Sequence, residues 1–278
     1  MPIGKNLGKV NMKRKIYDKL LQWKNEKDGT TALMIEGTRR IGKSYIAERF
    51  AEKEYESYIL IDFSKASARV RGWFDEYLED IDTLLQNIQL HYKKKLTPRK
   101  SLIIFDEVQK CPRAREAIKA LVEDHRFDYI ETGSLISIKK NVDDILIPSE
   151  EDGIEMYPMD FEEFMWAMGD EVMYTYIRKC FETNKPMGDF HREAMRYFRQ
   201  YLIVGGMPQA VKEYVNSKDF NKVDAIKRQI LRLYRNDIKK YAGSAKTKVA
   251  SIFEAIPGQL QKNEKKFKLA DLNDEARM

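Results

Sequence analysis

The chain has 278 residues, of which 43% are hydrophobic and 34% charged, a balance typical of a globular protein with one or two domains. No stretch approaches the roughly 20 apolar residues of a membrane-spanning helix. The amino terminus lacks the apolar segment of a secretory signal, and two distant cysteines exclude a disulfide framework. We therefore expect a cytoplasmic protein with no membrane partner.

The net charge of +6 is unevenly distributed. Residues 170–278 contain 22 Lys and Arg against 14 Asp and Glu, whereas the residues before them contain 28 against 30. This basic part could bind DNA or an acidic protein partner. A well-solvated helical surface would account for the same composition.

Helix and strand patterns alternate through the first 160 residues. Apolar spacing over residues 13–28 predicts an amphipathic helix, and residues 73–94 predict one or two more. Short apolar runs between the helical segments predict buried strands, which implies a parallel sheet covered on both faces. The predicted strands lie at residues 32–37, 58–63, 101–107, 127–134 and 153–159.

Strand patterns end near residue 160, and helical periodicity continues from there. GGMP at residues 205–208 interrupts it, because glycine and proline break helices. We therefore expect a helical second region. Its predicted helices lie at residues 160–168, 192–204, 209–215 and 222–242.

The first strand leads into GTRRIGKS, residues 37–44, which matches the phosphate-loop pattern G-x-x-x-x-G-K-[ST]. Gly37 and Gly42 allow the tight turn that aims backbone N–H groups at an anion. Lys43 would reach the β- and γ-phosphates, and the Ser44 hydroxyl would bind Mg²⁺. The residues expected to contact the nucleotide here are Gly37, Thr38, Arg39, Arg40, Ile41, Gly42, Lys43, Ser44 and Tyr45.

An acidic pair follows the apolar run of residues 101–105. Asp106 stands where ligands bind in open α/β sheets, so we expect it to hold Mg²⁺. Glu107, one residue later, could orient and deprotonate an attacking water. Thr132 and Ser134, at the end of the fourth strand, could contact the γ-phosphate or that water; Ser134 could instead cap a helix.

GTRRIGKS, FDEVQKCP, ETGS, YPMDFEEF, YLIVGGMP and LYRNDIKKYA, in this order, resemble one family. It comprises bacterial and archaeal AAA+-type P-loop ATPases that carry a carboxyl-terminal domain of unknown function. The resemblance implies an ASCE-type α/β sheet with strand order 5-1-4-3-2, a helical lid and a winged-helix region. It also implies that Pro208 lies against the adenine.

The resemblance divides the chain into a P-loop domain over residues 1–169, a lid over 170–242 and the start of a winged helix over 243–278. The family normally continues further, so the chain is expected to be truncated. Residues 248–260 and 265–276 would form the first two helices of the winged helix.

Residues 138–153 lack the Gly-Arg pair expected before the last strand. An arginine that reaches the γ-phosphate could come from a neighbouring subunit, so the chain could form a homo-oligomer. Spacing alone does not choose among Arg113, Arg115, Arg39 and Arg40.

These observations favour an Mg²⁺-dependent ATPase whose hydrolysis cycle switches the arrangement of its domains. A binding module that holds ATP or ADP with little turnover is the alternative. A small-molecule kinase is disfavoured by the Asp106-Glu107 pair, and the absence of an NKxD-type segment favours ATP over GTP.

Overall fold

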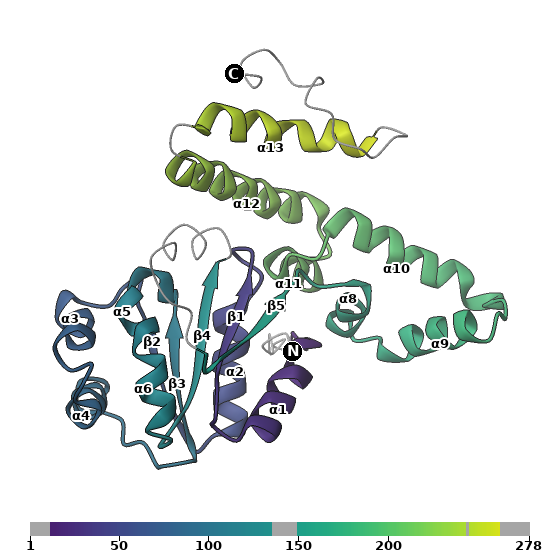
Figure 1. Ribbon diagram of the computed structural model, residues 1–278. Coiled ribbons are helices and arrows are strands. Elements are labelled where there is room, and N and C mark those ends of the chain that lie inside the picture. The colour runs from purple at the N-terminus through teal and green to yellow at the C-terminus, as the bar shows by residue number, and fades with distance from the viewer. Residues whose placement is uncertain (1–11, 135–148, 243–244, 262–278) are drawn as a thin grey trace, which may run out of the picture. The chain divides into compact units, whose positions relative to one another are not determined.

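The computed structural model describes residues 12–134, 149–242 and 245–261 (Figure 1). The chain divides into two compact units, Met1–Lys218 and Asp219–Met278. The sheet and the helices up to α11 belong to the first unit, and α12 and α13 belong to the second. The domain boundaries expected after residues 169 and 242 stay predictions.

Five parallel strands form the sheet of the first unit, in the order β2-β3-β4-β1-β5. This arrangement confirms the expected strand number and the expected order 5-1-4-3-2. The first four predicted strands agree with the observed strands within one residue, whereas the fifth, predicted over residues 153–159, lies two to three residues earlier in the structure. The strands are β1 (Ala32–Gly37), β2 (Ser57–Asp62), β3 (Ser101–Asp106), β4 (Asp128–Ser134) and β5 (Glu151–Met156).

Helices cover both faces of this sheet and enclose two separate cores (Figure 1). Successive residues of a strand point to opposite faces, so Leu33 belongs to one core and Met34 to the other. The central strands β3 and β4 are buried along their whole length. One core includes α1 (Ile16–Lys27) and α2 (Lys43–Glu54); the other includes α3 (Ala68–Glu76), α4 (Ile81–Tyr92), η1 (Val108–Lys110), α5 (Pro112–Glu116) and α6 (Ile118–Glu123).

The described residues that follow β5 are helical, as the periodicity predicts. Asp160 begins α8 with a capping box: its side chain accepts from the Glu163 N–H, and the Glu163 side chain accepts from the Asp160 N–H. Gly169, in the left-handed region, ends the same helix. The helices of this part are α8 (Phe161–Met168), α9 (Glu171–Glu182), η2 (Gly188–Phe190), α10 (His191–Val204) and α11 (Pro208–Ser217).

The second unit contains α12 (Phe220–Tyr241) and α13 (Lys246–Gln261). Arg235 of α12 forms a two-pronged ion pair with Glu254 of α13. The helix expected over residues 265–276 lies outside the described residues, so the winged helix stays a prediction. Among the residues that the structure describes, none of the helices is sufficiently long and apolar to cross a membrane.

Candidate nucleotide-binding site

The loop between β1 and α2 depends on two glycines. Gly37 has a φ of 148°, and a Cβ atom there would lie 2.3 Å from the carbonyl oxygen of Met156. Gly42, with a φ of 95°, precedes the first residue of α2. Side chains rarely adopt these conformations, so glycine is needed at both places. The loop thereby opens directly onto the amino terminus of a helix, where backbone N–H groups favour an anion.

Lys43 is folded back over this loop. Its Nζ donates to the carbonyl oxygens of Gly37, at 3.0 Å, and Thr38, at 2.8 Å. Burial, the largest influence, lowers the pKa of the Lys43 ammonium, whereas the carboxylates of Glu107 and Asp106 raise it. A phosphate beside this ammonium would add negative charge that favours its protonated form.

Asp106 joins the phosphate loop to the sheet. Its Oδ1 accepts from Ser44 Oγ, at 2.6 Å, and from Thr132 Oγ1, at 2.5 Å. The three residues come from the start of α2 and from the ends of β3 and β4, which are brought together by the parallel sheet. This cluster of oxygen atoms has the chemistry that Mg²⁺ prefers.

Glu107 follows β3 in the left-handed region, with a φ of 55°. Its N–H donates to Thr132 Oγ1 at 3.4 Å, and its Oε2 accepts from Gln109 Nε2 at 2.6 Å. Gln109 was not identified from the sequence, although its spacing from Glu107 suits a local side-chain hydrogen bond. The Glu107 carboxylate is therefore held at the carboxyl end of β3.

Ser134 is buried at the end of β4, where it pairs in register with Gly37 at the end of β1. It therefore lies beside the start of the phosphate loop. Thr132, two residues earlier on the same strand, donates to Asp106. The structure thus brings both predicted β4 hydroxyl residues to the loop end of the sheet.

A cavity of about 810 Å³ lies against the phosphate loop. Pro208 lines it, and Pro208 Cγ is 4.0 Å from the position that a Cβ atom on Gly42 would take. Sequence reasoning missed several of its other residues, which are scattered along the chain. The lining comprises residues 39–45, Met12, Arg14, Glu48, Arg49, Glu52, Lys65, Glu107, Pro208, Gln209 and Lys212.

The four candidate arginines occupy different places. Arg39 and Arg40 line the cavity. Arg113 is exposed and pairs with Asp75 and Glu116, whereas Arg115 is buried in a two-pronged ion pair with Glu151 of β5. Of these four candidates, the two loop arginines are at the cavity. Residues 138–148 of the stretch without a Gly-Arg pair lie outside the described residues.

A parallel sheet in this order, with a glycine-rich loop before α2 and an acidic pair after β3, defines the P-loop class of nucleotide-binding proteins. Residues 29–165 match the family model of the AAA domain, and residues 195–278 match a domain of unknown function. The chain therefore belongs to the AAA-type P-loop ATPases that carry this second domain, as the motifs predicted.

Two of the solved structures that are similar to this chain are the following. A Walker-type ATPase of Pyrococcus abyssi has 16% identity and a TM-score of 0.46, over 90% of this chain and 77% of its own. PCH-2 of C. elegans has 11% identity and a TM-score of 0.39, over 78% of this chain and 68% of its own. The comparison with curated proteins gave no match.

Proposed function

We propose that this chain binds ATP together with Mg²⁺, hydrolyses it, and uses the cycle to switch the arrangement of its parts. The observation that carries the proposal is the hydrogen-bonded cluster of Ser44, Asp106 and Thr132 beside Lys43. An ordinary glycine turn does not need a buried lysine and a carboxylate with two hydroxyl donors at the ends of three elements. A phosphate-binding metal site uses all of them.

The donor set fits Mg²⁺. Ser44 Oγ and Asp106 Oδ1 are 2.6 Å apart, so one small cation could take both oxygens as ligands. Among the described residues, no group of three or more His, Cys, Asp or Glu side chains could hold a metal ion by itself. This favours Mg²⁺ held jointly by protein and nucleotide phosphates, where it would neutralise charge on the phosphate oxygens.

The protein side chains have distinct roles in this proposal. Lys43 would bind the β- and γ-phosphates, and the loop N–H groups would surround them. Glu107, whose carboxylate is held by Gln109, would orient the attacking water and accept its proton. Thr132 would fix the orientation of Asp106, and Ser134 would contact the γ-phosphate or the water.

Pro208 would lie against the adenine. It lines the same cavity as Lys43 and Ser44, and it is the first residue of α11. The fixed ring of a proline offers a flat apolar surface at little entropic cost. Gln209, the next residue, lines the cavity as well and could supply a polar contact to the base.

The output of the cycle would be binding to an acidic partner, for which duplex DNA is the direct probe. Within the second unit, α12 has four exposed basic residues at spacings of four, three and four, which puts them on one helix face. Two of the four are matched by the carboxylates of Asp224 and Glu254. The four residues are Arg228, Arg232, Arg235 and Lys239.

Removal of Arg232 and Lys239 should weaken DNA binding and reduce its salt dependence by about one to two released counterions. A titration of duplex DNA at several salt concentrations measures both quantities. An unchanged salt slope in the double variant would exclude this face as the DNA site.

The nucleotide site is tested by Lys43→Ala. The variant should lose ATP binding, measured by titration with a fluorescent ATP analogue in the presence of Mg²⁺, because its ammonium is the cation that the loop holds toward the phosphates. Lys53→Ala removes an exposed lysine of the same helix that does not line the cavity, and serves as a control. Unaltered affinity in Lys43→Ala would contradict the role of the loop.

A further inference from the structure

Arg14, just before α1, is a buried cation that contacts the phosphate loop. Its side chain is only 5% exposed, and its Nη1 donates to the carbonyl oxygen of Ile41, inside the loop, at 2.8 Å. Its Nη2 donates to the carbonyl oxygen of Tyr157, just after β5, at 2.6 Å. One guanidinium therefore holds the loop against the end of the sheet's edge strand.

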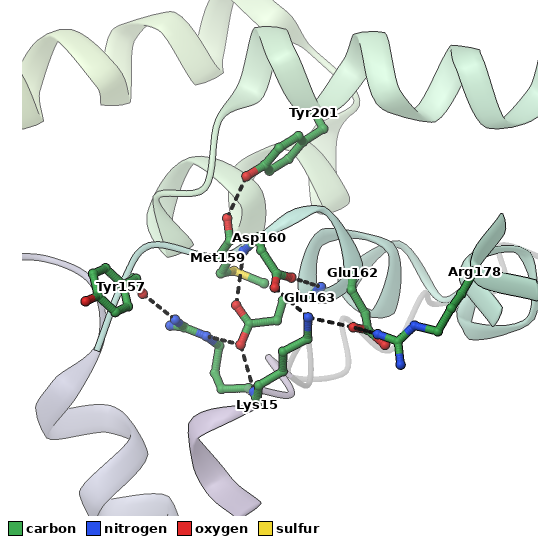
Figure 2. A network of polar contacts seen from close by, with 9 residues as sticks. Lys15, Tyr157, Met159, Asp160, Glu162, Glu163, Arg178 and Tyr201 are labelled. Atoms are coloured by element: carbon green, nitrogen blue, oxygen red, sulfur yellow. Dashed lines mark hydrogen bonds and ion pairs between the residues drawn. The ribbon is translucent and has the colours of Figure 1, made fainter. Parts of the chain in front are cut away.

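The same guanidinium reaches the first turn of α8. Arg14 Nε donates to Glu163 Oε1 at 3.1 Å, and the Glu163 side chain is buried as well. Figure 2 shows how Glu163 is surrounded: the Lys15 N–H donates to its Oε1 at 2.7 Å, and the Asp160 N–H donates to its Oε2 at 3.1 Å. The buried ion pair is thus fully hydrogen-bonded, as such a pair must be to persist.

From α8 the connections continue to the loop that carries Pro208. The Met159 N–H donates to the carbonyl oxygen of Gly206 at 2.7 Å. The Tyr201 hydroxyl donates to the Met159 carbonyl oxygen at 3.0 Å (Figure 2). A Cβ atom on Gly206 would lie 2.1 Å from that carbonyl oxygen. The two backbones are therefore in direct contact, two residues before Pro208.

Arg14 and Pro208 both lie near Gly42 of the phosphate loop. Arg14 Nη1 and Pro208 Cγ each lie 4.0 Å from the position that a Cβ atom on Gly42 would take. The phosphate loop, Arg14 and the start of α11 consequently line the cavity close to one another, and residues 159–163 are hydrogen-bonded both to Arg14 and to the backbone before α11.

We infer that Arg14 is a positioning residue that couples, by way of the start of α8, two elements that line the nucleotide cavity: the phosphate loop and the start of α11. The inference rests on the proposed binding of a nucleotide at the loop. The Ile41 carbonyl belongs to the same loop backbone as the N–H groups that would bind phosphate. A nucleotide that fixes the conformation of this backbone therefore also fixes the position of the Arg14 guanidinium. The ion pair to Glu163 then passes this positional constraint to α8 and, through Met159 and Gly206, to Pro208.

Arginine is suited to this coupling and lysine is not. A planar guanidinium carries five N–H donors in a fixed fork, so it can bind two carbonyl oxygens and a carboxylate at the same time. A lysine ammonium could keep the pair with Glu163 but has no rigid fork to hold Ile41 and Tyr157 in fixed positions. Arg14→Lys therefore keeps the positive charge of the side chain but removes the geometry of the guanidinium.

The test is hydrogen–deuterium exchange of the full chain with and without ADP and Mg²⁺. In the wild type, nucleotide should protect the phosphate loop, residues 205–208 at the cavity and, in addition, residues 160–168, which do not line it. In Arg14→Gln and Arg14→Lys at saturating nucleotide, loop protection should remain while the response of residues 160–168 is lost. Nucleotide affinity should fall by about tenfold, within the range typical of coupled sites.

Lys15→Ala is the matched control. Lys15 forms ion pairs with Asp160 and Glu162 at the start of the same helix, and it does not line the cavity. Its removal should leave the exchange response of residues 160–168 unchanged. Glu163→Gln keeps the size and one acceptor oxygen of the side chain, and it interrupts the same connection in case Arg14→Gln does not fold. It should also lose the nucleotide-dependent protection of residues 160–168.

Two results would overturn the inference: protection of the loop alone in the wild type, or a full response of residues 160–168 in folded Arg14 and Glu163 variants. A purely structural Arg14 would lower the melting temperature without changing the nucleotide-dependent part of the exchange. Failure of the proposed function itself would be distinct, because nucleotide would then protect neither the loop nor the distant segments in any variant.

Discussion

Glu131 on β4 is a fully buried carboxyl group, and its replacement by glutamine makes a quantitative test of the electrostatics beneath the site. Glu151 of β5 lies beside it, Arg115 of α5 binds Glu151, and Glu36 of β1 also acts on Arg115. Burial raises the pKa of Glu131 well above its ordinary value, and the Glu151 carboxylate raises it further, whereas Arg115 lowers it. When Glu131 is protonated and neutral, the positive charge of Arg115 is matched by the negative charge of Glu151.

The sign of the pH effect follows from this direction. Above the pKa of an exposed glutamate near 4.5, the unfolded chain loses the Glu131 proton while the folded chain keeps it. Folding then takes up a proton, so stability decreases as pH rises, by up to about 1.4 kcal/mol per pH unit until the folded group ionises. Glutamine resembles the protonated form of glutamate, so the stability of Glu131→Gln should not decrease with pH in this way.

Urea unfolding of the wild type and of Glu131→Gln at a series of pH values from 5 to 8 measures the effect. The difference in unfolding free energy should grow in favour of the variant as pH rises. Glu79→Gln, the same substitution at an exposed position, should run parallel to the wild type. A pH-independent difference between Glu131→Gln and the wild type would refute the reasoning.

Two further predictions concern the cavity. Gly206→Ala should weaken ADP binding and destabilise the fold by about 1 to 3 kcal/mol, because its Cβ would meet a backbone carbonyl oxygen at 2.1 Å. The control is Gly153→Ala, where the added Cβ meets open space. This control should match the wild type in ADP titration and in thermal melting. Gln109→Ala should slow phosphate release about ten- to hundredfold at unchanged ATP affinity, because Gln109 holds the Glu107 carboxylate. An unchanged rate would show that Glu107 needs no such partner.

The strands and the phosphate loop could be predicted because their signals are local. The strands β1, β2 and β3 each contain a short apolar run that ends at a glycine or an acidic residue, and the glycines of GTRRIGKS specify their own turn. The mostly polar β5, by contrast, was predicted two to three residues too late. Asp106 was identified for the same reason, since it follows directly on a fully buried strand. The strand order was not visible in these patterns and came from the family resemblance.

Arg14 could not be predicted as a buried residue. It lies in a run of charges, KRK, which resembles a solvated helix start, and its partner Glu163 is 149 residues away. The same holds for Arg115, whose burial depends on a carboxylate in β5. In both cases a tertiary contact, not the neighbouring sequence, decides whether the charge faces water.

The central claim is that Glu107 acts on water at a nucleotide held by the phosphate loop. Steady-state phosphate release from ATP and Mg²⁺ by the wild type and by Glu107→Gln, with ATP affinity measured in parallel, tests it most directly. The variant should bind ATP as the wild type does but release phosphate at least about a hundredfold more slowly. Equal rates in the two proteins, or ATP binding by the wild type without phosphate release above background, would contradict the claim and favour a nucleotide-holding module.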